Sequence, residues 1–292
     1  MQAGAAALLV RQTNIMWAGW AAAYSFYMSL PPQRAAESVL QHTLRHASRH
    51  VAQLAVWACL AAGFAAFVVD NGGVALGDRA NHAAVFHWAQ LGYVLDALGV
   101  YVVVEGVAAV ARCGVRGAAA AAVGWCRGQS RVAVVAVAAA ILADGVLGAH
   151  YTYAHPFLLA DNRHYTFYLW GRVLARYPVL WWAAAVLHVA VVVRLLSAFP
   201  SPALAVAWLA ATAAAVVPSP LLEPRYYITP VLVAVLTSSL LRQHRGGGGS
   251  SGWPLALVLV AAGQVAVCAA ALALFIVRPF TAPDGSVGRF MW

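Results

Sequence analysis

Apolar windows long enough to cross a lipid bilayer recur along the whole chain. A transmembrane helix needs about 20 mostly apolar residues to span a hydrocarbon core of ~30 Å, and the windows predict roughly eight such helices. They lie at 1–27, 51–69, 84–110, 131–149, 178–197, 203–219, 226–241 and 254–277. Hydrophobic residues make up 63% of the chain and charged residues 9%, whereas about a quarter of a soluble domain is charged. The sequence therefore predicts an all-α fold, a polytopic transmembrane bundle over residues 1–292.

The charges between the windows predict how the bundle is oriented. Segments after the first, third, fifth and seventh windows hold Glu37 as their only acid, and their arginines are Arg34, Arg45, Arg49, Arg112, Arg116, Arg127, Arg131, Arg194, Arg242 and Arg245. The opposite segments mix arginines with Asp78, Asp161, Glu223 and Asp284. An excess of positive charge marks the cytosolic side. We therefore predict a flexible cytosolic Gly/Ser loop at 242–253, and a lumenal or outer face shared by 155–168, 221–227 and the C-terminus.

Several function classes find no support in the sequence. The net charge of +9 comes entirely from arginine without lysine, and no RNA-binding signature accompanies it, so we predict no nucleic-acid partner. The cysteines lack metal-ligand spacing: Cys59 and Cys268 fall in apolar windows and Cys113 and Cys126 in a predicted cytosolic segment. We predict neither a metal nor a cofactor.

A few polar residues interrupt the apolar windows. Arg11 and Asn14 are three positions apart and share a helix face; the arginine either snorkels or pairs with another helix, or its guanidinium holds a lipid-linked phosphate. Asp96 and Glu105 are nine positions apart, on opposite faces of one predicted helix, so we expect them to have separate partners. Asp144 is predicted to be interfacial, near the lumenal end of its helix.

The loop after the fourth window contains the densest polar cluster. His155, Asp161, Arg163 and His164 lie within ten positions, among aromatic residues. Asp161 and Asn162 can cap a helix that starts at Arg163, which would place Arg163 and His164 in a first turn that favours anions. The cluster suits a phosphate or pyrophosphate at the membrane surface, although capping alone is the simpler interpretation.

Two neighbouring features have equally open interpretations. Tyr165, Phe167, Tyr168 and Trp170 fit an aromatic belt at the membrane interface. The turn Glu223-Pro224-Arg225 fits a local ion pair or a second charged part of the same site.

Six motifs resemble, in the same order, motifs of the dolichyl-phosphate-glucose-dependent α-1,2-glucosyltransferases of the endoplasmic reticulum. They are Arg11-Gln12-Thr13-Asn14-Ile15-Met16-Trp17, Gly77-Asp78-Arg79 with His82, His87-Trp88-Ala89-Gln90-Leu91, the loop from His155 to Tyr168, Leu222-Glu223-Pro224-Arg225-Tyr226-Tyr227, and Arg289-Phe290-Met291-Trp292. They span nearly the whole chain, and the long loop is the most specific of them.

The resemblance implies a function. That family adds the last glucose to the lipid-linked oligosaccharide of N-glycosylation, and it belongs to the lumen-facing, inverting glycosyltransferases of the GT-C class. It implies a dolichyl-phosphate-glucose donor, a dolichyl-pyrophosphate oligosaccharide acceptor, and a multi-pass location in the endoplasmic reticulum membrane with a lumenal active face. Cations near the leaving phosphate would stabilise its charge. The implied phosphate- or substrate-binding candidates are Arg163, His164, Arg225, Arg11, Asn14, His155, Asn162, Tyr165 and Tyr226.

The chain also departs from the family pattern. Family members begin with further helices and a first lumenal loop whose Asp-Glu pair is thought to supply the catalytic base. This chain opens at the helix containing Arg11 and resembles the C-terminal part, so we expect it to be inactive alone, with Asp161 or Glu223 as the in-chain fallback for the base. The alternative is a non-catalytic membrane protein that binds dolichol-linked lipid or regulates another membrane protein. A transporter is least favoured, because the polar clusters gather at one interface rather than at the midplane.

Overall fold

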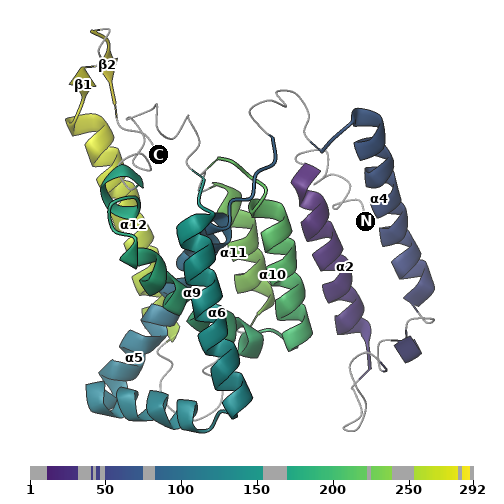
Figure 1. Cartoon of the computed structure of the whole chain (residues 1–292), viewed down its shortest axis with the longest axis horizontal. Helices are drawn as coiled ribbons and strands as arrows, with labels where there is room; N and C mark the ends of the chain where they lie inside the picture. Colours follow the sequence, from purple (N-terminus) through teal and green to yellow (C-terminus); the bar gives the residue numbers. More distant parts are fainter. Residues whose placement is uncertain are drawn as a thin grey trace.

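The computed structural model describes residues 12–31, 41, 44–46, 50–74, 83–153, 170–221, 225–238, 253–281 and 285–289. These ranges are almost wholly helical, which confirms the predicted all-α class (Figure 1). The helices are η1 (Gln12–Asn14), α2 (Ile15–Ser29), α4 (Val51–Asn71), α5 (Ala89–Arg127), α6 (Arg131–His150), η3 (Trp170–Leu174), α9 (Val179–Ala198), α10 (Pro202–Val216), α11 (Arg225–Thr237) and α12 (Trp253–Val277). Two paired strands of two residues each, β1 (Phe280–Thr281) and β2 (Val287–Gly288), follow α12.

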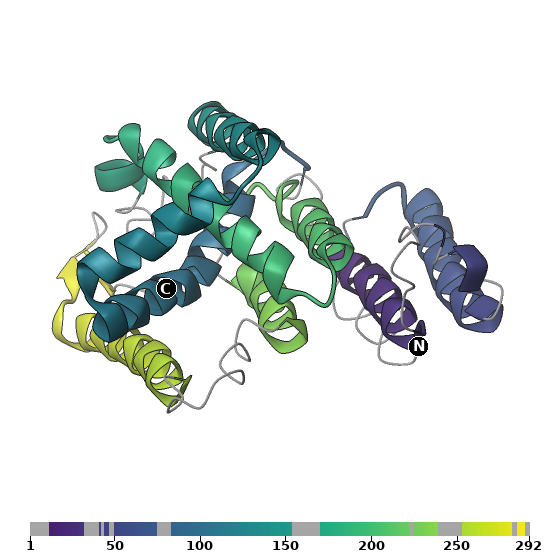
Figure 2. The same cartoon turned by 90° about the horizontal axis from the view of Figure 1, so that it is seen from below.

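The helices form a polytopic bundle whose core lies where α5, α9 and α10 meet. Buried apolar side chains from these three helices, among them Leu98, Val191 and Trp208, pack there. Figures 1 and 2 agree in placing α2 between α10 and α4. Four helices, α4, α5, α6 and α9, contain windows long and apolar enough to cross a bilayer, and α10, α11 and α12 contain shorter apolar stretches.

Local sequence explains several helix ends. Ser130 and Ser201 cap α6 and α10 by accepting hydrogen bonds from the backbone N–H of Ala133 and Leu204. Pro202 follows the second cap at the first helical position, where its missing N–H has no consequence. Gly72 ends α4 with a φ of 67°, a left-handed conformation that glycine adopts readily.

The third predicted helix, 84–110, is wrong at both ends. Residues 83–87 are not helical, because the N–H groups of Val85 and His87 donate to the carbonyls of Pro218 and Val217 at 3.1 and 3.0 Å. At the other end α5 continues to Arg127, so Arg112, Arg116, Cys113 and Cys126 lie on a helix and not in a loop. Hydropathy marks where a helix leaves the membrane, whereas the alanine-rich run at 118–122 continues the helix beyond that point.

A bend at Gly114 divides α5. This residue has φ 71° and ψ 168°, a backbone conformation that is essentially limited to glycine. Beyond it the helix turns and runs across the lower end of the bundle toward α6 (Figure 1). The remaining windows agree with the observed helices within a few residues where both are described. The predicted Gly/Ser loop falls almost wholly outside the described residues, as does the predicted helix start at Arg163.

Glycines let α5 and α6 approach α9 closely. A Cβ added to Gly92 on α5 would lie 2.7 Å from Cε1 of His188, and one added to Gly145 on α6 would lie 2.5 Å from the ring of Trp182. Gly148, one turn further along α6, faces Trp181 in the same way. The absence of side chains at these positions therefore brings three helices within hydrogen-bonding reach of one another.

Candidate functional site

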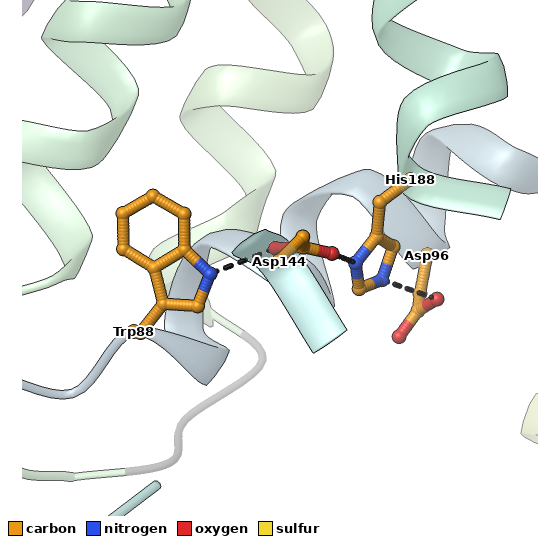
Figure 3. Close-up of polar contacts among 4 residues, drawn as sticks. All are labelled: Trp88, Asp96, Asp144 and His188. Atoms are coloured by element: carbon orange, nitrogen blue, oxygen red, sulfur yellow. Dashed lines mark hydrogen bonds and ion pairs between the residues drawn. The ribbon is translucent and has the colours of Figure 1, made fainter. Parts of the chain in front are cut away.

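A chain of four polar side chains runs through the contact between α5, α6 and α9 (Figure 3). The indole Nε1–H of Trp88 donates to Asp144 Oδ1 at 2.7 Å. The second carboxylate oxygen of Asp144 lies 2.7 Å from His188 Nδ1, and His188 Nε2 lies 3.0 Å from Asp96 Oδ1. These three contacts link residues that are up to 100 positions apart in the sequence.

The network descends from one end of the bundle toward its middle. Trp88 immediately precedes α5, and Asp144 lies six residues before the end of α6. His188 lies nine residues into α9, which places it ~13 Å from the start of that helix at a rise of 1.5 Å per residue. The side chains of His188 and Asp144 are only 6% and 16% exposed, whereas that of Asp96 is 45% exposed. The network therefore has a buried centre and one accessible carboxylate.

The geometry constrains the protons of this network. Both ring nitrogens of His188 face carboxylate oxygens, and a neutral imidazole has only one N–H to donate. With both aspartates ionised, the ring must therefore carry two protons, and the three groups together have a net charge of −1. The carboxylates bind opposite nitrogens, and the described residues contain no His, Cys, Asp and Glu group suited to a metal ion.

The structure shows the partners of these acids. Asp144, predicted to be interfacial near the lumenal end of its helix, accepts from Trp88 and contacts His188, so its carboxylate lies between helices. Glu105 and Asp96 do have separate partners, as predicted: Glu105 accepts from Arg194 Nε and a terminal Arg194 nitrogen at 2.9 and 2.8 Å. Both partners, His188 and Arg194, belong to α9.

A second group of contacts joins the helix ends near Trp88. The Gln90 amide donates to the carbonyls of Ser219 and Leu221 at 3.1 and 2.7 Å, and its oxygen accepts from the hydroxyl of Tyr227 at 2.5 Å. The N–H of Trp88 donates to the carbonyl of Tyr151. We call this end of the bundle, where 83–90 meets the ends of α6 and α10 and the start of α11, the junction.

His87 is a polar side chain buried in the junction. It is 1% exposed, and neither ring nitrogen makes a hydrogen bond to a described residue; the hydroxyl of neighbouring Tyr93 is likewise buried without one. The imidazole meets the rings of Tyr93 and Tyr153 edge-on. Burial lowers the pKa of His87 from 6.5 to about 4, an effect that the nearby backbone of Ser219 partly offsets. This histidine is therefore neutral near pH 7.

Few of the predicted site residues can be placed. Outside the described residues lie Arg11, His155, Asp161, Asn162, Arg163, His164, Tyr165 and Glu223. Arg225 begins α11, but only its backbone is described. Asn14 ends η1 and makes no capping bond to α2. Tyr226 packs against the core beside Tyr227, at the junction.

Asp96 and Asp144 stand out in the sequence as acids in apolar windows, whereas His188 and Trp88 were not predicted to belong to a site. His188 is an ionisable residue inside an apolar window, and in a membrane protein such a residue points by default to a functional site. Trp88 and Gln90 lie within a motif that carried the family resemblance, but neither was assigned a role. Their partners come from distant helices, so spacing alone does not show them.

Comparisons with known proteins agree with the motifs. The family model described as "DIE2/ALG10 family" matches residues 1–236. Three relatives carry the name Dol-P-Glc:Glc(2)Man(9)GlcNAc(2)-PP-Dol alpha-1,2-glucosyltransferase. The one from Mycosarcoma maydis is 26% identical over 98% of this chain and 55% of its own length; those from Homo sapiens and Yarrowia lipolytica are 25% and 27% identical over 99% of this chain, and 62% and 66% of theirs.

No solved structure matches the chain. The chain spans between about half and two thirds of the length of the curated relatives named above. Because the family model covers well over half of the 292 residues, the chain belongs to the DIE2/ALG10 family.

Proposed function

We propose that the complete protein transfers a terminal α-1,2-linked glucose from dolichyl-phosphate-glucose to a dolichyl-pyrophosphate-linked oligosaccharide. The relatives' names state this donor, acceptor and linkage, and the family match supports carrying them over to this chain. The reaction would take place at the lumenal face of the endoplasmic reticulum membrane, within the pathway of protein N-glycosylation. Since the relatives are longer, the proposal concerns the complete enzyme.

The observation that carries this proposal is the hydrogen bond between Gln90 and Tyr227. Each residue belongs to a motif that resembles the glucosyltransferases, and 137 positions separate them. They meet at the junction, on the side where the charge pattern predicts the lumen. Two motifs far apart in the sequence therefore meet at one end of the bundle, which supports the proposal of a single site there.

The proposed chemistry is an inverting single displacement. A carboxylate takes the proton of an acceptor sugar hydroxyl, whose oxygen attacks the anomeric carbon of glucose while the bond from that carbon to the phosphate oxygen breaks. Cations stabilise the charge on the departing dolichyl phosphate, and for this role we propose Arg163, His164, Arg225 and Arg11. Asp161 and Glu223 are the in-chain candidates for the base.

The remaining candidates would bind substrate. Hydrogen-bonding and aromatic side chains suit sugar hydroxyls and the phosphate, and the proposed contacts are Asn14, His155, Asn162, Tyr165 and Tyr226.

A complementation experiment tests the proposal. The complete protein would be expressed in Yarrowia lipolytica cells that lack their own relative, and the lipid-linked oligosaccharides would be separated by chromatography. We expect oligosaccharides with three glucoses to reappear. Arg163→Ala should abolish that product at unchanged protein level, whereas Arg176→Ala, an arginine whose guanidinium stacks over Tyr177, should not.

Two results would contradict the proposal. A membrane-inserted protein that leaves the oligosaccharide with two glucoses would contradict the transferase activity and support the non-catalytic alternative. An unchanged product in Arg163→Ala would contradict the phosphate-binding role of that residue.

A further inference from the structure

We propose that Phe86, Trp88 and Tyr151 form a stacking surface for the acceptor oligosaccharide, and that Asp144 and His188 position Trp88 within it. The proposal rests on the proposed function, which it extends by assigning the acceptor a place at the junction. Sugars present apolar C–H faces beside their hydroxyls, and rigid aromatic side chains match those faces at low entropic cost.

The three rings form one continuous cluster. The ring centroid of Phe86 lies 6.2 Å from that of Trp88 and 5.3 Å from that of Tyr151, which it meets edge-on. Phe86 and Tyr151 are 54% and 50% exposed, so the cluster is accessible to a ligand. It lies at the end of the bundle where 83–88 and the end of α6 come together.

The backbone beneath the surface is fixed on both sides. The Trp88 N–H donates to the Tyr151 carbonyl at 2.9 Å, which joins the two segments that supply the rings. The N–H groups flanking Phe86, those of Val85 and His87, are bonded to the end of α10. Phe86 therefore lies on non-helical backbone that is held on both sides, and Tyr151 lies directly after the end of α6.

The buried network orients the central ring. The carboxylate of Asp144 holds the Trp88 indole at 2.7 Å, and His188 holds the other oxygen of the same carboxylate at the same distance. Gly92 leaves room for the imidazole. Apolar packing of equal volume is often as stable as a buried charged group or more so, so stability alone does not account for this network. We assign to the network the role of orienting Trp88.

Glycan binding without donor tests the surface. The complete protein in lipid nanodiscs would be titrated with radiolabelled Glc(2)Man(9)GlcNAc(2) oligosaccharide. Phe86→Ala should raise the dissociation constant about three- to tenfold, the range expected for one lost aromatic contact. It should leave the KM for the donor unchanged. Val69→Ala is the matched control, because Val69 is 83% exposed near the end of α4 at the same end of the bundle, and it should leave glycan binding unchanged.

A second set of variants tests the positioning. Asp144→Leu and Trp88→Phe each remove the indole contact, so both should weaken glycan binding, and the double variant should be no worse than either one. Asp144→Asn keeps an oxygen that can accept from the indole and should rescue binding. Glu105→Gln alters the ion pair with Arg194, which joins α5 and α9 outside the network, and serves as the control.

The outcomes separate this inference from the proposed function. Binding needs no glucose transfer, so a protein that binds the glycan through Phe86 but makes no product would contradict only the transferase activity. A protein that transfers glucose while Phe86→Ala binds the glycan normally would overturn the stacking surface, as would a wild-type protein that binds no glycan. Additive losses in Asp144→Leu and Trp88→Phe, or a lower protein level with unchanged affinity, would reduce the network to a structural role.

Discussion

At the residue scale, the close contact between Gly92 and His188 leaves no space for a side chain at position 92. Because a Cβ at Gly92 would lie 2.7 Å from the imidazole, Gly92→Ala must displace His188 or separate α5 from α9. We expect destabilisation of about 1–3 kcal/mol, as for other overpacked cores. Unfolding of the purified protein by denaturant titration in micelles would measure it.

Gly106→Ala provides the control on the same helix. No atom lies within 4 Å of a Cβ at Gly106, and alanine favours a helix over glycine by about 0.5–1 kcal/mol, so this variant should be neutral or stabilising. Equal destabilisation by both substitutions would show that the His188 contact is not the cause.

His87 links protonation to stability. Its folded pKa of about 4 lies below the ordinary value of 6.5, so between these pH values the unfolded chain binds a proton that the folded protein does not. The contribution of neutral His87 to the free energy of unfolding is therefore fully present above pH 6.5 and decreases as the pH is lowered toward 4, below which it no longer changes. The loss over this range is of order 3 kcal/mol. We expect His87→Phe to flatten this part of the profile, measured as melting temperature against pH. A variant with the same slope as the wild type would assign the pH dependence to other groups.

The polar residues themselves were visible in the sequence, but their partners were not. Asp96, Glu105 and Asp144 stood out as acids in apolar windows, and the prediction of separate partners for Asp96 and Glu105 is confirmed. The partners of Asp144 could not be predicted, because helical spacing describes one helix at a time. The bond from Asp144 to His188 depends on how α6 packs on α9.

At the element scale, hydropathy predicted helices well where a membrane span and a helix coincide. The windows 51–69, 131–149 and 178–197 match α4, α6 and α9 within two residues at each end. The window 84–110 differs from α5, because Val85 and His87 pair with the segment after α10 and the helix continues beyond its apolar stretch. Both differences arise from backbone contacts and helix propensity, to which an average of side-chain hydropathy is insensitive.

The bend in α5 depends on Gly114. An alanine there would meet backbone strain of about 1–3 kcal/mol, so Gly114→Ala should shift the segment beyond the bend toward a straighter path. Spin labels on Cys126 and on Val206→Cys, in a protein without its other cysteines, would report their separation by pulsed electron resonance. We expect a displaced or broadened distance distribution.

Gly124→Ala is the matched control for the bend. It lies on the same segment, with no atom within 4 Å of the added Cβ, and should leave the distance unchanged. A distribution identical in wild type and Gly114→Ala would contradict the claim that glycine sets the bend.

At the scale of the whole molecule, the two ends of the bundle differ in character. The junction contains Gln90, Tyr227 and the buried His87, and the aromatic surface lies beside them. The opposite end contains the arginine-bearing part of α5 beyond the bend (Figure 1). This separation fits an enzyme whose site opens on one side of a membrane, with the basic end anchored on the other.

The charge pattern predicts that the junction faces the lumen, and glycosylation tagging in microsomes tests this orientation. The sequence contains no native Asn-X-Ser/Thr acceptor, so an inserted sequon is read without background. We expect modification of a sequon placed beside Asp161, and none of one placed in the Gly246–Gly252 loop. In sealed microsomes, Cys126 as the single remaining cysteine should react with a membrane-impermeant maleimide, because it is exposed at the opposite end. The reverse pattern in both assays would place the junction in the cytosol, away from the proposed lumenal substrates.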